Sequence, residues 1–362
     1  MGFLSRRRQR GMALIIVMML FAILATITAG ILYRQDRFRI RADNLLQWDK
    51  RYQYALAAEV VAVQALNDDL ADDRRTNSLE DDCSQEHWAV ELPPTPYEDA
   101  VLSASIQDLQ GRFNLNWLVT AGGEGFVRDD EARDMLKRLL QQILPDPSKA
   151  LLLADEMTDW IDSNNIVDAA DGAEDPSYRF RRTPNMPVAH ESELRALHDF
   201  TVKDLFADPR YWGLFTALPV GTKLNVNTAS PQVLDAVLGG VAGASAAKAV
   251  VALREDKPIL KISDLMAQAP FEALKAEQKE ALSKRLGVAS EYFQVMVDIQ
   301  VGDGVSRLVS RVQRLAAGAD GTHVYSREMV PLLTPLEPAC NPFYNDGSDN
   351  NKANLITNLP AQ

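Results

Sequence analysis

An uninterrupted apolar run lies directly behind a basic patch at the start of the chain. Residues 12–33 are twenty-two residues without a charged side chain. A helix of this length, with a rise of about 1.5 Å per residue, reaches roughly 30 Å and can cross a bilayer. Four arginines precede the run, at positions 6, 7, 8 and 10, and they favour a cytoplasmic N-terminus. The pattern predicts a single-pass membrane protein with the bulk of the chain outside the cytoplasm.

The basic patch ends at Gly11, and the apolar run starts at Met12. A secretory signal carries a small-x-small cleavage site after its apolar core, but this run continues through Gly30 to Tyr33 without one. A cut between Gly11 and Met12 would keep the apolar helix in the mature protein, as in prepilins. Residues 1–11 are therefore predicted to be a prepilin leader, although hydropathy alone also fits a generic membrane anchor.

A second apolar pattern follows the membrane run and has the period of a helix. Apolar residues recur every three or four positions, which marks one face of an amphipathic helix. They are Leu45, Trp48, Tyr52, Leu56, Val60, Val63, Leu66 and Leu70. Because residues 31–70 contain no proline or glycine, one helix is predicted from near Met12 to near Leu70. Aspartates at 68, 69, 72 and 73 end the apolar pattern.

Alternating apolar and polar residues predict strands in two separate parts of the chain. The clearest alternation covers residues 293–301, and a Gly-Asp-Gly turn separates it from a partner strand at 305–315. Residues 323–330 are a candidate further strand. Much earlier, residues 102–107 alternate, and the alternation resumes over residues 113–117. These segments predict one small antiparallel sheet that the long helix covers.

Residues 128–286, between the two groups of strands, have helical periodicity. Apolar positions mark one helix up to residue 143 and another over residues 151–161. Ser230 followed by Pro231 predicts the start of a third, with serine as N-cap and proline at the first helical position. A helical domain inserted into a sheet gives an α+β fold, and an insertion whose two ends meet at one sheet edge is ordinary.

Length, charge and cysteine content limit the function. About 330 residues follow the membrane run, more than one typical domain. The chain carries a formal charge of −12, and −16 without residues 1–11, which argues against nucleic acid and is compatible with divalent cations. The only cysteines, Cys83 and Cys340, could pair in an oxidising compartment. Two separate thiols remain the alternative.

An acidic segment suggests a metal site. Eight acidic residues lie between positions 155 and 175, and no lysine or arginine falls between Lys149 and Arg179. Calcium takes roughly six to eight oxygen ligands, and the spacing here is not that of an EF-hand. The candidate ligands are Asp162, Asp168, Asp171, Glu174 and Asp175. Asp155 and Asp159 are expected to face solvent, and a solvated acidic loop without an ion is the alternative.

Residues 225–234 resemble the helix-hairpin-helix modules of DNA-binding proteins. Such modules bind phosphate through the amides of a glycine turn backed by basic side chains. The turn at residues 239–243 has no lysine or arginine, so a structural or protein-binding module is predicted, without nucleic acid. The sequence contains no Gly-x-Ser-x-Gly motif and no phosphate-cradling loop, and we do not expect an enzyme.

Four motifs, together with the leader and the inserted domain, resemble one family. The motifs are Gly111-Arg112-Phe113-Asn114-Leu115-Asn116, Asp159-Trp160-Ile161-Asp162, Asp171-Gly172-Ala173-Glu174-Asp175 and Leu224-Asn225-Val226-Asn227-Thr228-Ala229. The combination is similar to the minor pseudopilin K of type II secretion, general secretion pathway protein K. The resemblance implies a pilin-like long N-terminal helix packed on a small antiparallel sheet, with a large inserted all-helical domain that is SAM-like or helix-hairpin-helix-like.

The resemblance also divides the chain into segments. It implies a leader at 1–11, a transmembrane half-helix at 12–33, the rest of the helix and first strands at 34–118, an inserted helical domain at 119–290, the remaining strands at 291–335 and a flexible tail at 336–362. Ordinary pilin-like subunits have glutamate at the fifth mature position, where this chain has Ile16. A buried carboxylate in lipid needs a cationic partner, and a tip subunit has no neighbour above it to supply one.

The function implied by the resemblance is a subunit at the tip of the pseudopilus that starts its assembly and supports protein export. Its expected partners are minor pseudopilins I and J, other pseudopilins, the prepilin peptidase, and exported proteins or the outer-membrane secretin. Methylation of Met12 and calcium in the inserted domain are also implied. One alternative is a minor pilin of a type IV pilus or competence system that contacts DNA. Another is a membrane-anchored periplasmic enzyme that uses the acidic segment as a metal site.

Overall fold

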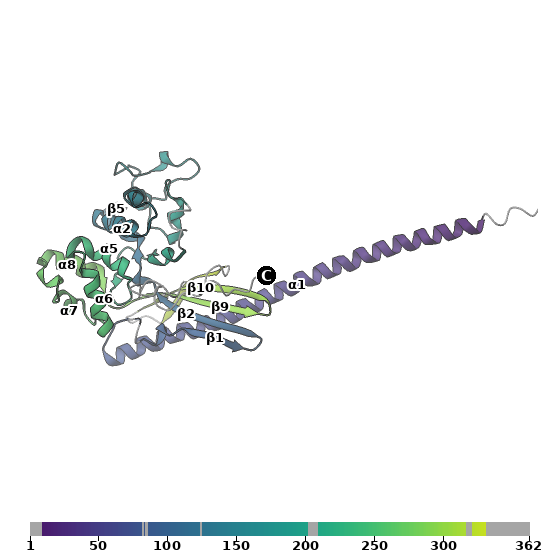
Figure 1. Ribbon diagram of the computed structural model, residues 1–362, viewed down its shortest axis with the longest axis horizontal. Helices are drawn as coiled ribbons and strands as arrows, with labels where there is room; N and C mark the ends of the chain where they lie inside the picture. The colour runs from purple at the N-terminus through teal and green to yellow at the C-terminus, as the bar shows by residue number, and fades with distance from the viewer. Residues whose placement is uncertain are drawn as a thin grey trace, which may run out of the picture.

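A single helix, α1 (Gln9–Thr76), dominates the shape of the molecule. The computed structural model describes residues 9–81, 83, 86–123, 125–201, 209–315 and 321–330. The N-terminal half of α1 projects away from the head, and the C-terminal half lies against the sheet (Figure 1). The predicted helix is confirmed, and it ends at Thr76, six residues beyond Leu70, so that the aspartates that end the apolar pattern still lie within the helix.

Five antiparallel strands form the sheet of the head, in the order β1-β2-β9-β10-β11. Their bounds are β1 (Leu92–Tyr97), β2 (Ala100–Asp108), β9 (Tyr292–Val301), β10 (Gly304–Arg314) and β11 (Thr322–Val330). The strands predicted at 102–107, 293–301, 305–315 and 323–330 are confirmed. The edge strand β1 was not predicted, because its three prolines are tolerated only where no further strand has to pair.

The long helix meets the sheet through small side chains. Ala55, Ala58, Ala62 and Leu66 are buried and pack on the face of the sheet that carries Phe293, Val295, Val297, Ile299 and Val301. The predicted stripe is wrong at Leu45, Trp48 and Val60, which are exposed, and is confirmed at Leu66 and Leu70, which are buried. The three alanines let this part of the helix approach the sheet closely.

Everything between β2 and β9 is an insertion, because these two strands pair directly with each other. Its helices are α2 (Asp130–Ile143), α3 (Ala150–Ile161), α5 (Pro231–Ala242), α6 (Ala246–Asp256), α7 (Ile262–Met266) and α8 (Ala276–Arg285). The insertion also contains three pairs of short strands: β3 (Phe113–Asn114) with β6 (Phe215–Thr216), β4 (Val119–Gly122) with β5 (Gly125–Arg128), and β7 (Leu224–Asn225) with β8 (Leu286–Gly287). Figure 1 shows the insertion at the end of the sheet near the C-terminal end of α1.

The insertion has its own hydrophobic core, which starts earlier in the sequence than the helical pattern does. Phe113, Leu115, Trp117 and Leu118 belong to this core. The strand predicted over residues 113–117 is wrong, since only Phe113–Asn114 form a strand and a short 3-10 helix follows at Leu115–Leu118. The alternation there arises because these side chains point into the core of the insertion. The predicted N-cap of α5 is confirmed, because Ser230 accepts a hydrogen bond from Val233 N.

Candidate functional site

A group of carboxylates lies where α3 ends in the insertion. Asp159 occupies the last turn of α3, Asp162 is its C-cap, and the following loop brings Asp168 back to them. One oxygen of each of these three residues lies within 4.8 Å of the others. Residues three apart at a helix end share one side of the helix, so the local sequence places two of the three carboxylates together.

Four buried carboxylate oxygens in and beside this group lack a hydrogen-bond partner among the described residues. Asp159 and Asp162 are fully buried, and Glu174 is 1% exposed. Within the described part of the chain, neither oxygen of Asp159 accepts a hydrogen bond, and the same holds for Asp162 Oδ1 and Glu174 Oε1. Buried oxygens of this kind normally have a donor or an ion, because leaving them without one costs free energy. The donor set, carboxylate oxygens close together, is the one that calcium prefers.

The pKa values of the buried carboxyl groups are raised as well. Burial raises the pKa of Asp159 to about 6 and that of Glu174 to about 7. Burial and the neighbouring charge of Asp168 raise the pKa of Asp162 to about 7. Crowded carboxylates without a cation resist ionisation. A bound divalent cation would remove this cost.

Gly172 closes the loop over the group. A Cβ atom on Gly172 would collide with Oδ2 of Asp159 and would lie 3.0 Å from its Cγ and 3.1 Å from a methyl group of Val167. Only glycine lets the backbone come this close to the carboxylate. The Asp171-Gly172 motif therefore has a steric role beside Asp159.

The candidate ligands divide into two sets in the structure. Asp162 and Asp168 lie in the group, and Glu174 borders it, with its Oε2 bonded to Thr183 Oγ1 at 2.9 Å. Asp171 is exposed, and Asp175 bonds Thr183 N at 2.9 Å.

The expectation that Asp155 and Asp159 face solvent is wrong. Asp155 is buried and paired with Arg133 at 3.0 Å, and Asp159 belongs to the carboxylate group. The i, i+3 spacing of Asp159 and Asp162 was the signal that could have included Asp159.

The N-terminal residues singled out from the sequence lie in α1. Gly11 and Met12 are in its first turns, and the side chain of Ile16 is 56% exposed on the projecting half. The helix is long and apolar enough to cross a membrane from Met12 onward. Cys83 is half-buried beside the head, while Cys340 lies outside the described residues, so their disulfide stays a prediction.

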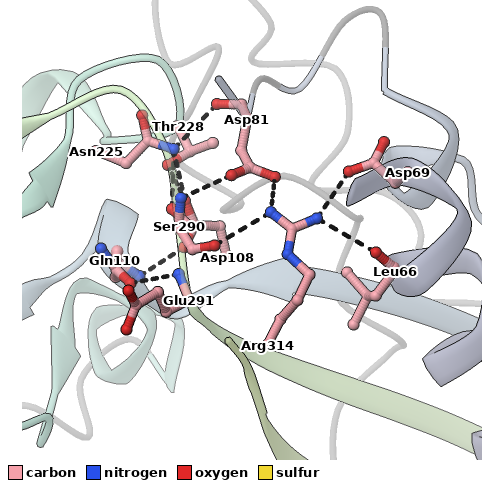
Figure 2. Close-up of polar contacts among 10 residues, drawn as sticks. All are labelled: Leu66, Asp69, Asp81, Asp108, Gln110, Asn225, Thr228, Ser290, Glu291 and Arg314. Atoms are coloured by element: carbon pink, nitrogen blue, oxygen red, sulfur yellow. Dashed lines mark hydrogen bonds and ion pairs between the residues drawn. The ribbon is translucent and has the colours of Figure 1, made fainter. Parts of the chain in front are cut away.

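A buried polar network joins α1, the sheet and the insertion (Figure 2). Arg314 of β10 donates to Asp69 of α1 at 2.8 Å and to Asp81 after the helix. Asp108, the last residue of β2, accepts from Ser290 Oγ and Thr228 Oγ1, each at 2.6 Å.

Asn225 completes the junction, because its amide donates to Asp108 at 3.0 Å and to the carbonyl of Asp81 at 3.0 Å. The point where the chain leaves the sheet and the point where it returns are therefore tied together and to the end of α1.

The asparagine motifs of the sequence hold the insertion together. Asn116 donates to Val188 O at 3.0 Å and to Leu218 O at 2.9 Å, and it accepts from Val188 N. Asn227 pairs with the backbone of Ile259 in both directions, at 2.9 and 3.1 Å. The two asparagine side chains thus satisfy backbone N–H and C=O groups of irregular segments, which have no partner in a helix or sheet.

The helix-hairpin-helix resemblance also has a structural explanation. Arg254 is buried and donates to the carbonyls of Val226 at 2.8 Å and Ala229 at 2.6 Å, so it is not available to a phosphate. A Cβ on Gly240 would meet the guanidinium of Arg138 at 2.7 Å. The turn predicted at residues 239–243 is wrong for its first four residues, which form the end of α5. Gly240 packs against α2, and the geometry favours a structural module.

Comparisons with known proteins agree with this architecture. The family model described as type II secretion system (T2SS), protein K matches residues 111–207, and a second model of the same description matches residues 224–289. The type II secretion system protein K of Pseudomonas aeruginosa is 31% identical over 331 residues, which is 90% of this chain and 94% of that protein. The chain belongs to the type II secretion system protein K family. The Aeromonas hydrophila member is 29% identical over 84% of this chain and 93% of its own length.

A chain in a solved complex has the same fold. It is from the crystal structure of the GspK-GspI-GspJ complex of the enterotoxigenic Escherichia coli type 2 secretion system. The match has a TM-score of 0.65 at 22% sequence identity and covers 80% of this chain and 99% of that chain. The expected fold class is confirmed, with a long N-terminal helix, a small antiparallel sheet and a large helical insertion.

Proposed function

We propose that this chain is the minor pseudopilin at the tip of a type II secretion pseudopilus, where it starts assembly and supports protein export across the outer membrane. Its role is one of geometry and binding, without catalytic turnover. The proposal rests above all on one observation: the insertion occupies the end of the head next to the C-terminal end of α1 (Figure 1). A repeating subunit needs that end open for the next subunit, and a terminal subunit does not.

The membrane half of α1 supports a terminal position as well. The fifth residue after the proposed cut is Ile16, so the helix buries no carboxylate there. A carboxylate in lipid requires a cation such as the terminal amine of a neighbour. A subunit with nothing above it has no such neighbour, and an apolar residue at this position avoids the cost.

Maturation is part of the proposal. The prepilin peptidase would cut between Gly11 and Met12 on the cytoplasmic side of the inner membrane, and Met12 would then be methylated. Mass spectrometry of the purified chain tests this directly. A methylated N-terminus at Met12 supports the pathway, whereas an intact leader would contradict it.

The proposed partners are minor pseudopilins I and J. The related protein K was solved in a complex with GspI and GspJ, and the exposed apolar residues of α1, such as Leu45, Leu46 and Val61, offer an apolar surface to other long helices. Other pseudopilins would follow below this complex. The head would then face exported proteins or the outer-membrane secretin.

We further propose that the carboxylate group of the insertion binds calcium. Asp159, Asp162, Asp168 and Glu174 would supply oxygen ligands, and the unsatisfied buried oxygens of Asp159, Asp162 and Glu174 support this. The ion would neutralise the crowded carboxylates and hold the loop after α3 against the helix. Its contribution is structural.

Genetic complementation tests the proposed function. In a strain without this gene, the full chain should restore pseudopilus assembly and export, and a chain without residues 12–33 should restore neither. Export that persists without the helix would favour a periplasmic enzyme. A pilus-associated role would instead appear as DNA binding by the head at physiological salt.

A further inference from the structure

A short loop of the insertion presents an aromatic ring and three arginines to solvent. We call residues 179–182, Arg179-Phe180-Arg181-Arg182, the arginine loop. The side chain of Phe180 is 88% exposed, and the three arginines are exposed beside it. An exposed phenylalanine surrounded by arginines is a combination enriched where proteins bind other proteins.

The loop is held firmly at its base. Thr183 N bonds Asp175 Oδ1 at 2.9 Å, and Thr183 Oγ1 bonds Glu174 Oε2 at 2.9 Å. Tyr178, just before the loop, is buried and packs edge-to-face on Trp160, with ring centroids 5.4 Å apart. The arginine loop is therefore a presented surface, and a partner need not order it from a disordered state.

The charges of the loop are not neutralised within the head. Arg182 approaches Asp175 at 3.9 Å, but its side chain is 88% exposed, so the pair is weak. Arg179 and Arg181 contact aromatic rings, Arg179 over Phe180 at 5.0 Å and Arg181 over Tyr178 at 5.9 Å. Within the described part of the chain these two arginines form no ion pair. Stacking leaves the guanidinium N–H groups able to bind carboxylates.

The position of the loop indicates what can reach it. The loops that follow α3, in teal in Figure 1, lie at the side of the insertion away from α1. Subunits that pack along α1 would therefore not cover the arginine loop. Its charge is opposite to that of the chain as a whole, which carries −12. A partner with carboxylates beside an apolar side chain matches both features of the loop.

We propose that the arginine loop binds an acidic segment, with an exposed apolar side chain, on the surface of a protein that is being exported. The chemistry of the surface is independent of the place of this chain in the pseudopilus, but the choice of an exported protein rests on the proposed function. Carboxylates would bind the three arginines, and the apolar side chain would pack on Phe180.

The first experiment measures binding to a defined probe. The full chain in detergent micelles is titrated with a fluorescent glutamate-rich peptide that carries one leucine. Replacing all three arginines of the loop by serine should weaken binding by about tenfold or more, and added salt should weaken the unchanged protein. Phe180→Ser keeps the charge and should weaken binding to a smaller extent.

A matched control separates the loop from net charge. Lys257, Lys261 and Lys284 are exposed elsewhere on the insertion, and their replacement by serine removes the same charge. This control should bind the peptide like the unchanged chain, and thermal unfolding should be the same for all variants. Equal binding by the arginine variant and the unchanged chain, or equal loss in the lysine control, would overturn the proposal.

The second experiment identifies the source of the acidic segment. The arginine variant is expressed in the strain that lacks this gene, and pseudopilus assembly and export are measured together. Normal assembly with reduced export supports the proposal. Normal export, or failed assembly, would overturn it, because the loop would then serve no cargo or would serve the filament. If the unchanged chain also fails to restore export, the proposed function itself fails, whatever the peptide shows.

Discussion

Arg314 donates to Asp69 across the interface between the sheet and the long helix, at 2.8 Å, and both side chains are almost completely buried. The same guanidinium reaches Asp81, which is also buried (Figure 2). One arginine therefore neutralises two acids that the fold removes from water. Through Asp81 and Asn225 the contact extends to the insertion. The orientation of the insertion relative to α1 depends on this junction.

Replacing Arg314 by methionine should destabilise the head strongly. The substitution keeps an apolar stem but leaves Asp69 and Asp81 buried without a cation, which costs about 3–5 kcal/mol in comparable cases. Denaturant unfolding of the full chain in micelles measures the effect. Arg75→Met is the control, because Arg75 pairs with Asp72 on the exposed surface of the same helix and such pairs contribute little. Equal stability of the two variants would contradict the role of the network.

Because α1 lies close to the sheet, a larger side chain should be tolerated on its exposed face but not in the interface. Ala62 lies in the interface and is 8% exposed, whereas the neighbouring Val61 is 68% exposed. Ala62→Leu should overpack the interface and cost about 1–3 kcal/mol, and Val61→Leu should change stability by less than about 0.5 kcal/mol. Thermal unfolding of the two variants compares them. A tolerated leucine at position 62 would show that the alanines do not set the distance between helix and sheet.

Calcium should stabilise the insertion. At a concentration of about a hundred times its dissociation constant, a ligand specific for the folded state adds about 2.7 kcal/mol, and chelator should remove the gain. Gly172→Ala should abolish it, because the new Cβ collides with Asp159 Oδ2. Gly123→Ala is the control, since nothing lies within 4 Å of a Cβ there. A melting temperature that does not respond to calcium would contradict calcium binding by the carboxylate group.

The metal-free chain should become more stable on acidification. The folded pKa values of Asp159, Asp162 and Glu174, about 6, 7 and 7, lie above the ordinary values of 3.8 and 4.5. The folded state therefore binds more protons than the unfolded state between these limits, and the free energy of unfolding rises as the pH falls.

In chelator, the melting temperature should be higher at about pH 5.5 than at about pH 8, by roughly 5 °C. The double variant Asp159→Asn, Asp162→Asn should respond less. A melting temperature that falls over this interval in the unchanged chain would contradict the reading of these carboxylates.

Local patterns in the sequence predict the long helix and most of the sheet. An unbroken helical stretch leads from the apolar run to residue 70, and the strict alternation at 293–301 reflects one face against α1. The alternation holds even though Gln294 and Met296, on the other face, are also buried. The reason is that the insertion covers that face at this end of the sheet, as the pair between Arg311 and Glu191 shows.

The alanine face of α1 and the buried positions of Asp69 and Asp159 depend on contacts between segments that are far apart in the sequence. Periodicity of large apolar residues could not find a helix face made of Ala55, Ala58 and Ala62, because alanine is a weak hydrophobic signal. Asp69 belongs to the run of aspartates that ends the apolar pattern, but in the structure it is a buried partner of Arg314. Asp159 was missed because a charged residue on a helix is normally solvated, and only the loop closed by Gly172 buries it.

The place of the chain in the filament is the central claim, and electron microscopy of labelled pseudopili tests it most directly. Pseudopili are isolated from cells that carry the full chain and are labelled with gold-conjugated antibody against the insertion. We predict label at one end of each filament, and filaments should be scarce without the chain. Label spaced regularly along the filaments would contradict it.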